Sequence, residues 1–446
     1  MTDCNRLQLA FSRIGRQNLQ GIFDGGAITS DGGALLLREV DQAIGLVDSI
    51  AAAMDDRRQS GKVTHDLRTL LAQRIYAIAM GYEDGNDHHE LRRDPLLQIM
   101  AERGIDADQP LASPATLCRF ENAVDRQSMA RFAEIFVEQF LAAHNTPPKQ
   151  IVLDFDATDD PVHGRQEGRF FHGYYDHYCY LPLYVFCGRH LLCGYLRPSR
   201  IDGAKHSRAI LKLLVQRIRR DWPETEIVFR GDSGFCRWKL LRWCDRNDVK
   251  YIVGLAKNAR LKALARREIT TAQWRYRRTR AKQRLFGEFN YAAGSWDAER
   301  RIIVKAEHGE QGDNPRFIVT NLDGDGQALY DDVYCQRGEM ENRIKEQQLA
   351  LFADRTSCHA FAANQFRLLL SSAAYTLFEA LRRLALAGTG LARAQCDTIR
   401  LKLLKIGARI TQSVRRIVLH LSSSYPRQHL LAAALDRLRH RQPVPL

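Results

Sequence analysis

Hydrophobic residues in the first 150 positions recur mainly at helical spacing. A helical run at 34–40 follows the polar pair Ser30-Asp31, and another at 113–122 begins with Ser113 and Pro114, a capping residue and a residue that suits the first turn. Further apolar positions follow steps of three and four, namely Leu67, Leu70, Leu71, Ile75, Ile78, Phe132, Phe136 and Phe140. The pattern predicts a mostly helical N-terminal region over residues 1–148.

After residue 148 the pattern changes to short strands. Residues 151–156 alternate between apolar and other side chains, which is the period of a strand. Further segments are predicted in this order: strands at 178–186 and 191–196, a helix at 204–220, a strand at 226–230, a helix at 238–246 and a strand at 251–255. Three strands, a helix, a strand, a helix and a strand is the element order of an RNase H-like core, with parallel crossovers between the later strands.

The remaining segments complete an α/β fold. Residues 258–322 are predicted to be a β-rich insertion, with strands at 301–305 and 317–320. Helical pattern resumes at 330–352 and 361–386, so the core comprises residues 149–257 and 323–390. Residues 391–446 form a C-terminal region, with strand pattern within 406–421 and a helix at 428–439.

Composition and charge point to a polyanionic partner. Among the 446 residues, 66 Lys and Arg exceed 52 Asp and Glu, which gives a net charge of +14. A field of this sign favours nucleic acid, although a basic protein without such a partner is the alternative. We expect a cytoplasmic protein with reduced thiols, because no apolar run approaches the roughly 20 residues of a membrane span, the N-terminus lacks a signal-peptide pattern, and no CxxC pair occurs.

Carboxylates follow two of the predicted strands. Asp154 and Asp156 lie at the end of the first strand, and Asp232 comes just after the strand at 226–230. If those strands are neighbours, their acids converge beyond the strand ends, where open α/β sheets place their sites. Carboxylates on a rigid strand suit a hard cation, whereas an acidic turn exposed to solvent is the alternative. The alternation does not by itself decide between Asp154 and Asp156, which share one strand face.

A third acid is expected from the helix after the insertion. Tyr334, Arg337, Glu341 and Lys345 follow steps of three and four, so they share one helix face. A solvent-exposed face with ion pairs between its own residues is the alternative. Tyr334 fits such a charged face poorly, and Glu341 lies where a third metal ligand is needed.

Three stretches resemble the acidic motifs of DDE transposases. They are Asp156-Ala-Thr158, Asp232 within residues 230–235, and Tyr334-x2-Arg337-x3-Glu341, which is similar to the Y-x2-R-x3-E-x6-K signature of bacterial insertion-sequence enzymes with a β-insertion. Residues 82–92, 111–122 and 159–168 resemble, more closely, the insertion-sequence group numbered thirteen-eighty. The likeness covers nearly the whole chain. It favours Asp156 over Asp154, because the family's acid lies two residues before Thr.

The resemblance implies binding of terminal inverted repeats, metal-dependent DNA cleavage and strand transfer. Asp156, Asp232 and Glu341 would hold two Mg²⁺ ions, with Mn²⁺ able to substitute. Arg337 and Lys345 would bind phosphates, and Tyr334 a sugar or phosphate. The partners would be double-stranded DNA and a second copy of the chain, at the nucleoid. The sequence departs from the signature at Gln348, where the family has Lys, and this puts the role of Lys345 in doubt.

Two more residues are candidates for DNA contact. Arg119 lies on the helix at 113–122, which is either a DNA-reading helix or an ordinary helix of a bundle. Trp274 lies in a basic stretch with aromatic residues, and either Trp274 or Trp296 would stack on an unpaired base unless both are core residues of the insertion. The rival functions are an RNase H-like nuclease or resolvase, and a DNA-binding relative without catalysis.

Overall fold

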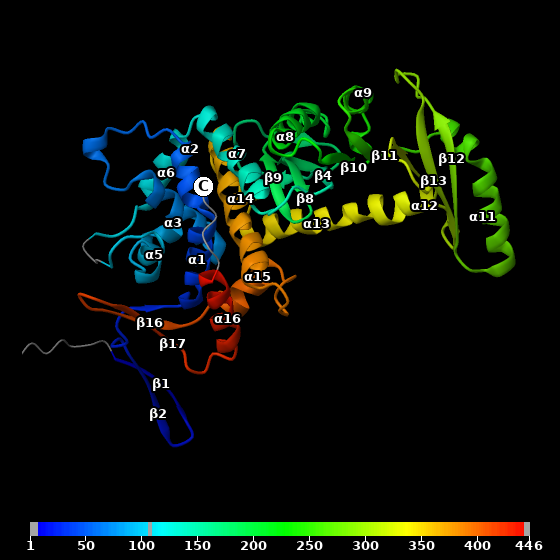
Figure 1. Cartoon of the computed structure of the whole chain (residues 1–446). Helices are drawn as coiled ribbons and strands as arrows, with labels where there is room; N and C mark the ends of the chain where they lie inside the picture. The colour runs from blue at the N-terminus through cyan, green and yellow to red at the C-terminus, as the bar shows by residue number, and fades with distance from the viewer. Residues whose placement is uncertain (1–7, 106–108, 441–446) are drawn as a thin grey trace, which may run out of the picture. The chain divides into compact units, whose positions relative to one another are not determined.

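The computed structural model describes residues 8–105 and 109–440 (Figure 1). The chain forms two compact units, Met1–Ala123 with Ala373–Leu446, and Val124–Ser372. This division differs from the domains predicted from sequence. Helix α7 (Arg126–Ala142) lies in the second unit, and α14 (Phe361–Leu384) begins in the second unit and ends in the first. The acids of interest all belong to the second unit.

A large mixed sheet is the centre of the second unit. Its strand order is β12-β13-β15-β11-β10-β4-β8-β9, with β14 paired to β13. The strands are β4 (Gln150–Ala157), β8 (Leu183–Cys187), β9 (His190–Tyr195), β10 (Glu226–Gly231), β11 (Lys250–Leu255), β12 (Gln283–Tyr291), β13 (Arg300–Gly309), β14 (Gly312–Asp313) and β15 (Arg316–Thr320).

Strand direction changes at β4. Strands β4, β10 and β11 are parallel, whereas β8 is antiparallel to β4 and β9 is antiparallel to β8. The parallel pairs are connected through helices, α8 (Ser207–Asp221) before β10 and α9 (Trp238–Arg246) before β11. These crossovers agree with the sequence prediction. Parallel neighbours bring the carboxyl ends of β4 and β10 to one edge of the sheet.

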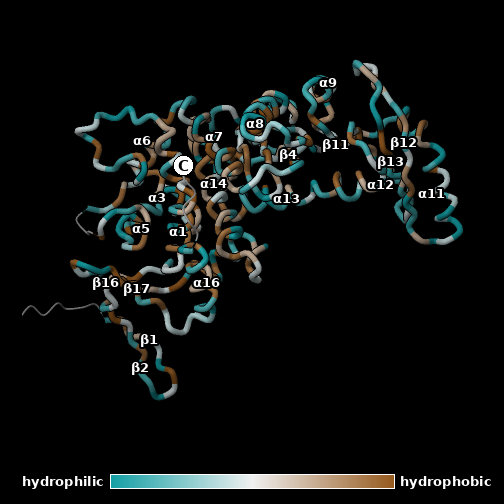
Figure 2. Tube along the Cα trace, viewed as in Figure 1, coloured by the Kyte–Doolittle hydropathy of each residue, from teal (hydrophilic) through white to brown (hydrophobic). Residues whose placement is uncertain are grey.

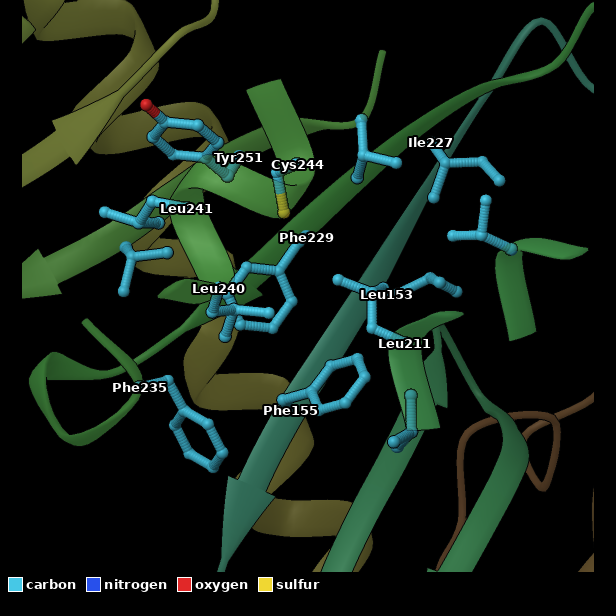
Figure 3. Packing of buried hydrophobic residues seen from close by; sticks show 14 of the residues in the cluster. Leu153, Phe155, Leu211, Ile227, Phe229, Phe235, Leu240, Leu241, Cys244 and Tyr251 are labelled. Atoms are coloured by element: carbon cyan, nitrogen blue, oxygen red, sulfur yellow. The ribbon is translucent and has the colours of Figure 1, made fainter. Parts of the chain in front are cut away.

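Each face of the sheet is buried under helices. On one face Leu153, Phe155 and Phe229 pack against residues of α7, α8 and α9 (Figure 3). On the other face Val152, Val228 and Ile252 pack against the helical segment that begins at Gly326. Both faces of β4 are therefore covered, which explains its nearly continuous burial and makes any charged residue on it costly unless it is paired.

The helical segment at 326–350 is continuous but not uniform. It consists of α12 (Gly326–Ala328), a π-helical turn Leu329–Tyr334, a 3-10 turn Cys335–Arg337, α13 (Gly338–Lys345) and a second π-helical turn Glu346–Ala350. The predicted helix over 330–352 is therefore present, but its two π-helical turns are wider than those of an ideal α-helix and its 3-10 turn is narrower. Such irregular turns occur frequently at functional sites.

The segment 258–322 is a mixture of helix and strand. It begins with α10 (Ala259–Leu264) and α11 (Arg266–Thr279), so the basic aromatic stretch is helical. Its strands do not form a separate barrel or sheet. Strand β15 pairs with β11, and β13 and β12 follow, so the insertion extends the central sheet. Helix α11 packs on β12 and β13 and is hydrophilic along much of its length (Figure 2).

The predicted strand at 178–186 is in fact two strands of different sheets. Strand β7 (His177–Tyr180) ends before Pro182, and β8 begins at Leu183. Proline has no backbone N–H to donate to a ladder, so the pairing changes there. Strand β7 lies between β5 (Asp160–Pro161) and β6 (Phe170–His172) in a small sheet of its own.

The first unit contains more strand than predicted. The region 1–148 was predicted to be mostly helical, but residues 8–29 form the strands β1 (Gln8–Ile14), β2 (Gln17–Ile22) and β3 (Ile28–Thr29). The helices α1 (Leu35–Ile44), α2 (Leu46–Ala53), α3 (Leu67–Met80), α4 (His88–Leu91), α5 (Pro95–Met100) and α6 (Pro114–Ala123) follow. Strand β3 pairs with β16 (Ala408–Gln412), which pairs with β17 (Ile417–Leu421), and α15 (Cys396–Ile399) and α16 (Gln428–Arg439) complete the unit.

Two negative findings apply to the described residues. None of the helices described combines the length and hydrophobicity that crossing a membrane requires. The described cysteines carry free thiols.

Candidate active site

Asp154 forms a buried ion pair within the sheet. Its side chain is almost fully buried, and both of its carboxylate oxygens accept hydrogen bonds from Arg230, at 2.5 Å from Nε and 2.7 Å from Nη2. Asp154 and Arg230 are also register partners on β4 and β10. The same guanidinium donates to the backbone carbonyl of Val333. The pair therefore connects two strands to the helical turn that ends at Tyr334.

Asp156 lies two residues further along β4, at the end of the strand. Its side chain is 15% exposed, and Arg337 Nη1 donates to Oδ2 at 3.2 Å. Burial raises the pKa of Asp156 to about 6, because the ionised carboxyl loses hydration. Arg337 and the backbone N–H of Ala157 oppose this rise, whereas the charges of Asp232 and Glu341 add to it. Asp232 and Glu341 are thus close enough to affect the ionisation of Asp156.

Asp232 follows the last residue of β10 and caps a short turn. Its Oδ1 accepts the backbone N–H of Gly234 at 2.8 Å, so one carboxylate oxygen is fixed by the chain itself. Gly254 on β11 lets Tyr334 approach this turn. A Cβ at position 254 would lie 2.6 Å from the Tyr334 hydroxyl and 2.8 Å from the backbone nitrogen of Ser233. Only glycine fits between these two segments.

Arg337 connects Asp156 with Glu341. Its Nη2 donates to Glu341 Oε1 at 2.9 Å, while Nη1 binds Asp156. Burial lowers the pKa of Arg337, but Asp156, Tyr334, Glu341 and Asp232 together raise it above its usual value. Glu341 is 48% exposed and Arg337 is 20% exposed. The site is therefore a row of carboxylates from β4, from the end of β10 and from α13, with one guanidinium between two of them.

The donor set fits a divalent metal ion in chemistry, but its arrangement does not form a coordination shell. In residues 8–105 and 109–440, no group of three or more His, Cys, Asp or Glu side chains is close enough to hold a metal ion. The guanidinium of Arg337 lies between two of the three acids. Carboxylates that repel one another are what a divalent cation stabilises, and oxygen donors are what Mg²⁺ prefers.

The sequence profile of the family Transposase DDE domain group 1 matches residues 11–443. The chain belongs to the DDE transposases. It is also similar to a solved structure, a cryo-electron microscopy structure of the piggyBac transposase in a synaptic complex with hairpin DNA. That similarity has 13% sequence identity and a TM-score of 0.40, and it covers 93% of this chain and 86% of the other. No curated protein matches the transposase.

Gln348 has a different role in this transposase from a phosphate-binding lysine. Its Nε2 donates to Asp160 Oδ1 at 2.8 Å and to the backbone carbonyl of Asp159 at 3.0 Å. Asp160 is fully buried, and burial raises its pKa well above the usual value. Gln348 thus stabilises a buried carboxyl group. Lys345 lies on α13 with its side chain exposed, and the structure pairs it with no carboxylate of the described residues.

The remaining predicted DNA-binding residues belong to other elements than the acids do. Arg119 is exposed on α6 in the first unit, next to Thr116, while Leu117 and Phe120 of the same helix are buried. Trp274 is 56% exposed on α11, with the Arg278 guanidinium 4.7 Å above its ring.

Trp296 is a core residue of the insertion. It packs against Tyr291 and Arg300 at the edge of the main core cluster. This partly buried position favours the alternative of a core role for Trp296 over base stacking.

Sequence reasoning missed a polar network in the first unit. Arg74 Nε donates to Glu121 Oε1 at 2.7 Å, and both side chains are at most 2% exposed. His88 is 3.1 Å from Arg74 Nη1, and burial, together with the charge of Arg74, lowers its pKa to about 3. Two of the stretches that resemble the insertion-sequence group, 82–92 and 111–122, meet here. His88 of the first stretch and Glu121 of the second therefore belong to one buried network with Arg74.

Exposed aromatic residues in the hairpin that follows Asp156 in the chain were also missed. Phe171, Tyr174 and Tyr178 are exposed large side chains on and between β6 and β7. The sequence contains a visible signal for them, since His172-Gly-Tyr-Tyr-Asp-His-Tyr178 has three tyrosines and two histidines in seven positions.

Proposed function

We propose that this transposase binds the terminal inverted repeats of a bacterial insertion sequence, cleaves DNA there and joins the ends to a target. The observation that carries the proposal is the position of Arg337, which binds Asp156 at the end of β4 and Glu341 on α13, while Asp232 follows the parallel neighbour of β4, β10. A site rich in acids opposes binding of a phosphate unless cations neutralise it, so a protein that only bound DNA would gain nothing from it.

The sheet supports an RNase H-like core. The order β9-β8-β4-β10-β11, antiparallel on one side of β4 and parallel on the other, is the arrangement that the element order predicts. We assign the core to residues 149–257 and 323–372, with the insertion between them. The similarity to the group numbered thirteen-eighty rests on sequence motifs, two of which supply His88 and Glu121 to the buried network around Arg74.

The three acids would hold two Mg²⁺ ions, or Mn²⁺ in their place. Bound divalent ions lower the pKa of a water molecule and offset charge at the reacting phosphate. The protein's own residues supply the positions: β4 fixes Asp156, the turn after β10 fixes one oxygen of Asp232, and Arg337 orients Glu341. In this proposal Arg337 and Lys345 also contact DNA phosphates. The Tyr334 hydroxyl lies close to Gly254, which in turn lies against the backbone at Asp232.

The protein would act as a homodimer on its two DNA ends, in the cytoplasm at the nucleoid. A stand-alone nuclease or resolvase is the second candidate, and it would cleave without discriminating the ends of an element. The family membership favours the transposase.

The decisive experiment is Mg²⁺-dependent cleavage by the full-length chain. The substrate is DNA that carries the inverted repeats flanking the gene, beside a scrambled duplex of equal length. Asp156→Ala, Asp232→Ala and Glu341→Ala should each reduce cleavage at least about 1000-fold and keep end binding within about two-fold. Glu339→Ala is the matched control, because Glu339 is an exposed acid on the same helix. Cleavage at the wild-type rate in one of the three variants would remove that residue from the site.

A further inference from the structure

A hairpin immediately after the catalytic strand presents aromatic rings to solvent. The aromatic hairpin consists of residues 170–180, with β6 and β7 paired in register. Phe171 faces Tyr178 across the pair with ring centroids 5.7 Å apart, and the two side chains are 54% and 47% exposed. Tyr174 in the turn is 86% exposed. These rings contribute little to the core, so their exposure requires another explanation.

The hairpin is attached closely to the end of β4. Only three residues separate Asp156 from Asp160, which pairs with Tyr180 of β7. His177 Nε2 lies 2.8 Å from Asp159 Oδ2, a second connection between the hairpin and the strand end. Tyr175 packs against His172 at 4.9 Å. Burial raises the pKa of Tyr175 to about 12, and the charges of Asp159 and Asp156 contribute to this rise. Tyr175 therefore lies within electrostatic range of the catalytic acid.

Guanidinium groups accompany the rings. Arg169 lies 4.4 Å from the ring centre of Tyr178, and Arg200 lies 4.6 Å from that of Phe170. Arg165 is exposed nearby in sequence. Two acids belong to the same stretch: Asp176 in the turn and Glu167, which accepts the backbone N–H of Phe361. Exposed aromatic rings with adjacent arginines are the combination that binds single-stranded nucleic acid through base stacking and phosphate contacts.

We propose that the aromatic hairpin binds unpaired bases of the DNA end beside the scissile phosphate, with Phe171 and Tyr174 as the stacking residues and Arg169 as a phosphate contact. The ligand class is single-stranded DNA, because bases inside a duplex are already stacked and cannot reach exposed rings. This inference rests on the proposed function for its place in DNA cleavage, but the binding itself does not depend on it.

The alternative stacking residue, Trp274, is further from the acids. Helix α11 packs on β12 and β13, on the outer part of the sheet (Figure 1). Five strand-to-strand steps separate β12 from β4 in the sheet order, which is about 24 Å at about 4.8 Å per step. The hairpin, by contrast, follows Asp156 directly. The stacking surface nearest the cut is therefore the hairpin.

Binding of a fluorescently labelled dT15 oligonucleotide by the full-length protein tests the inference. The double variant Phe171→Ala, Tyr174→Ala should bind it at least about five-fold more weakly, the lower bound for one lost stacked base. Binding of a blunt duplex of equal length should change less than two-fold. Tyr174→Trp should bind like wild type, since it keeps a stacking ring. Leu213→Ala, at a residue 66% exposed on α8, is the matched control.

A second measurement places the hairpin in cleavage. The double variant should cleave a fully paired end more slowly than wild type and recover on an end with mismatched bases at the cut. If wild-type protein cleaves no DNA, the proposed function fails, while the oligonucleotide result still decides whether the hairpin binds single strands.

Four outcomes would overturn the inference. The first is unchanged affinity for dT15 in a folded double variant, and the second is an equal loss of affinity for the duplex. The third is a larger loss of dT15 affinity in Trp274→Ala than in the double variant. The fourth is a changed sedimentation coefficient with unchanged DNA binding. The last would make the hairpin a contact between copies of the chain. Circular dichroism melting of each variant checks the fold.

Discussion

Both oxygens of the Asp154 carboxylate accept hydrogen bonds from the Arg230 guanidinium, at 2.5 and 2.7 Å, and both side chains are almost fully buried. Removing one partner of a buried pair leaves the other charge unsatisfied, which costs about 3–5 kcal/mol. Asp154→Asn should therefore lower the melting temperature strongly, with loss of cleavage that parallels loss of folded protein. Normal stability with abolished cleavage would instead make Asp154 a catalytic residue.

In metal-free protein, replacing Asp156 should raise the stability of the fold, whereas replacing Asp154 should lower it. Its folded pKa of about 6 exceeds the ordinary 3.8, so the folded state binds its proton more tightly than the unfolded state. The resulting stability is full below about pH 4 and is lost as the pH rises to about 6. Asp156→Asn should therefore be more stable than wild type above pH 6, by on the order of 1–3 kcal/mol, and equal to it at pH 4.

Chemical unfolding in EDTA at pH 4 and pH 7.5 measures this difference. A variant that is less stable than wild type at pH 7.5 would show that the Arg337 contact outweighs the burial of the carboxyl group.

These two aspartates also show what the sequence can and cannot predict. The alternating pattern places both on one strand face, and the order of helices and strands predicts parallel neighbours, so the convergence of Asp156 with Asp232 follows from the sequence. The partner of Asp154 does not, because Arg230 is 76 residues away and its pairing depends on the register of β4 and β10. In the sequence, only the family resemblance distinguishes the two acids.

Other differences have equally local causes. Pro182 divides a run that reads as one strand, and the pattern of apolar residues cannot show that its two halves pair in different sheets. Residues 8–22 form an exposed hairpin, which lacks the buried stripe that a pattern analysis looks for. Gln348 occupies the lysine position of the family signature and donates a hydrogen bond to the buried Asp160, which is 188 residues away in the sequence.

Arg337 holds the pKa of Asp156 down, so removing its charge should raise that pKa further. In Arg337→Gln the pH range over which stability declines should extend above about 6, and cleavage should fall at least about ten-fold because Glu341 loses its orienting contact. Unfolding free energies between pH 4 and pH 8.5 measure the first effect. Lys345→Gln, at an exposed position of the same helix, should leave the pH profile unchanged. An identical profile in Arg337→Gln would exclude the coupling.

The Arg74–Glu121 pair should stabilise the first unit. Both side chains are nearly fully buried, so Arg74→Met removes one charge of a buried ion pair and should cost about 3–5 kcal/mol. Hydrogen exchange should show faster exchange in α3 and α6 but unchanged protection in β4 and β10 of the second unit. Arg93→Met, at an exposed arginine of the same unit, is the control. Uniformly faster exchange in both units would show that they unfold together.

Sequence discrimination between DNA ends should depend on Arg119 rather than on the insertion. A truncation starting at Asp154 cannot test this, because it cuts β4, and the first unit also needs residues after 372.

Point variants avoid the problem. Arg119→Ala should reduce the preference for the inverted repeat over a scrambled duplex by about five-fold or more, since a base contact carries about 1–3 kcal/mol. Arg278 lies beside Trp274. Arg278→Ala should weaken binding of both duplexes equally and reduce the slope of log affinity against log salt by about one. Competition binding at 50 and 200 mM salt separates the two effects. Equal weakening on both duplexes by Arg119→Ala would make α6 an ordinary helix of the bundle with a phosphate contact.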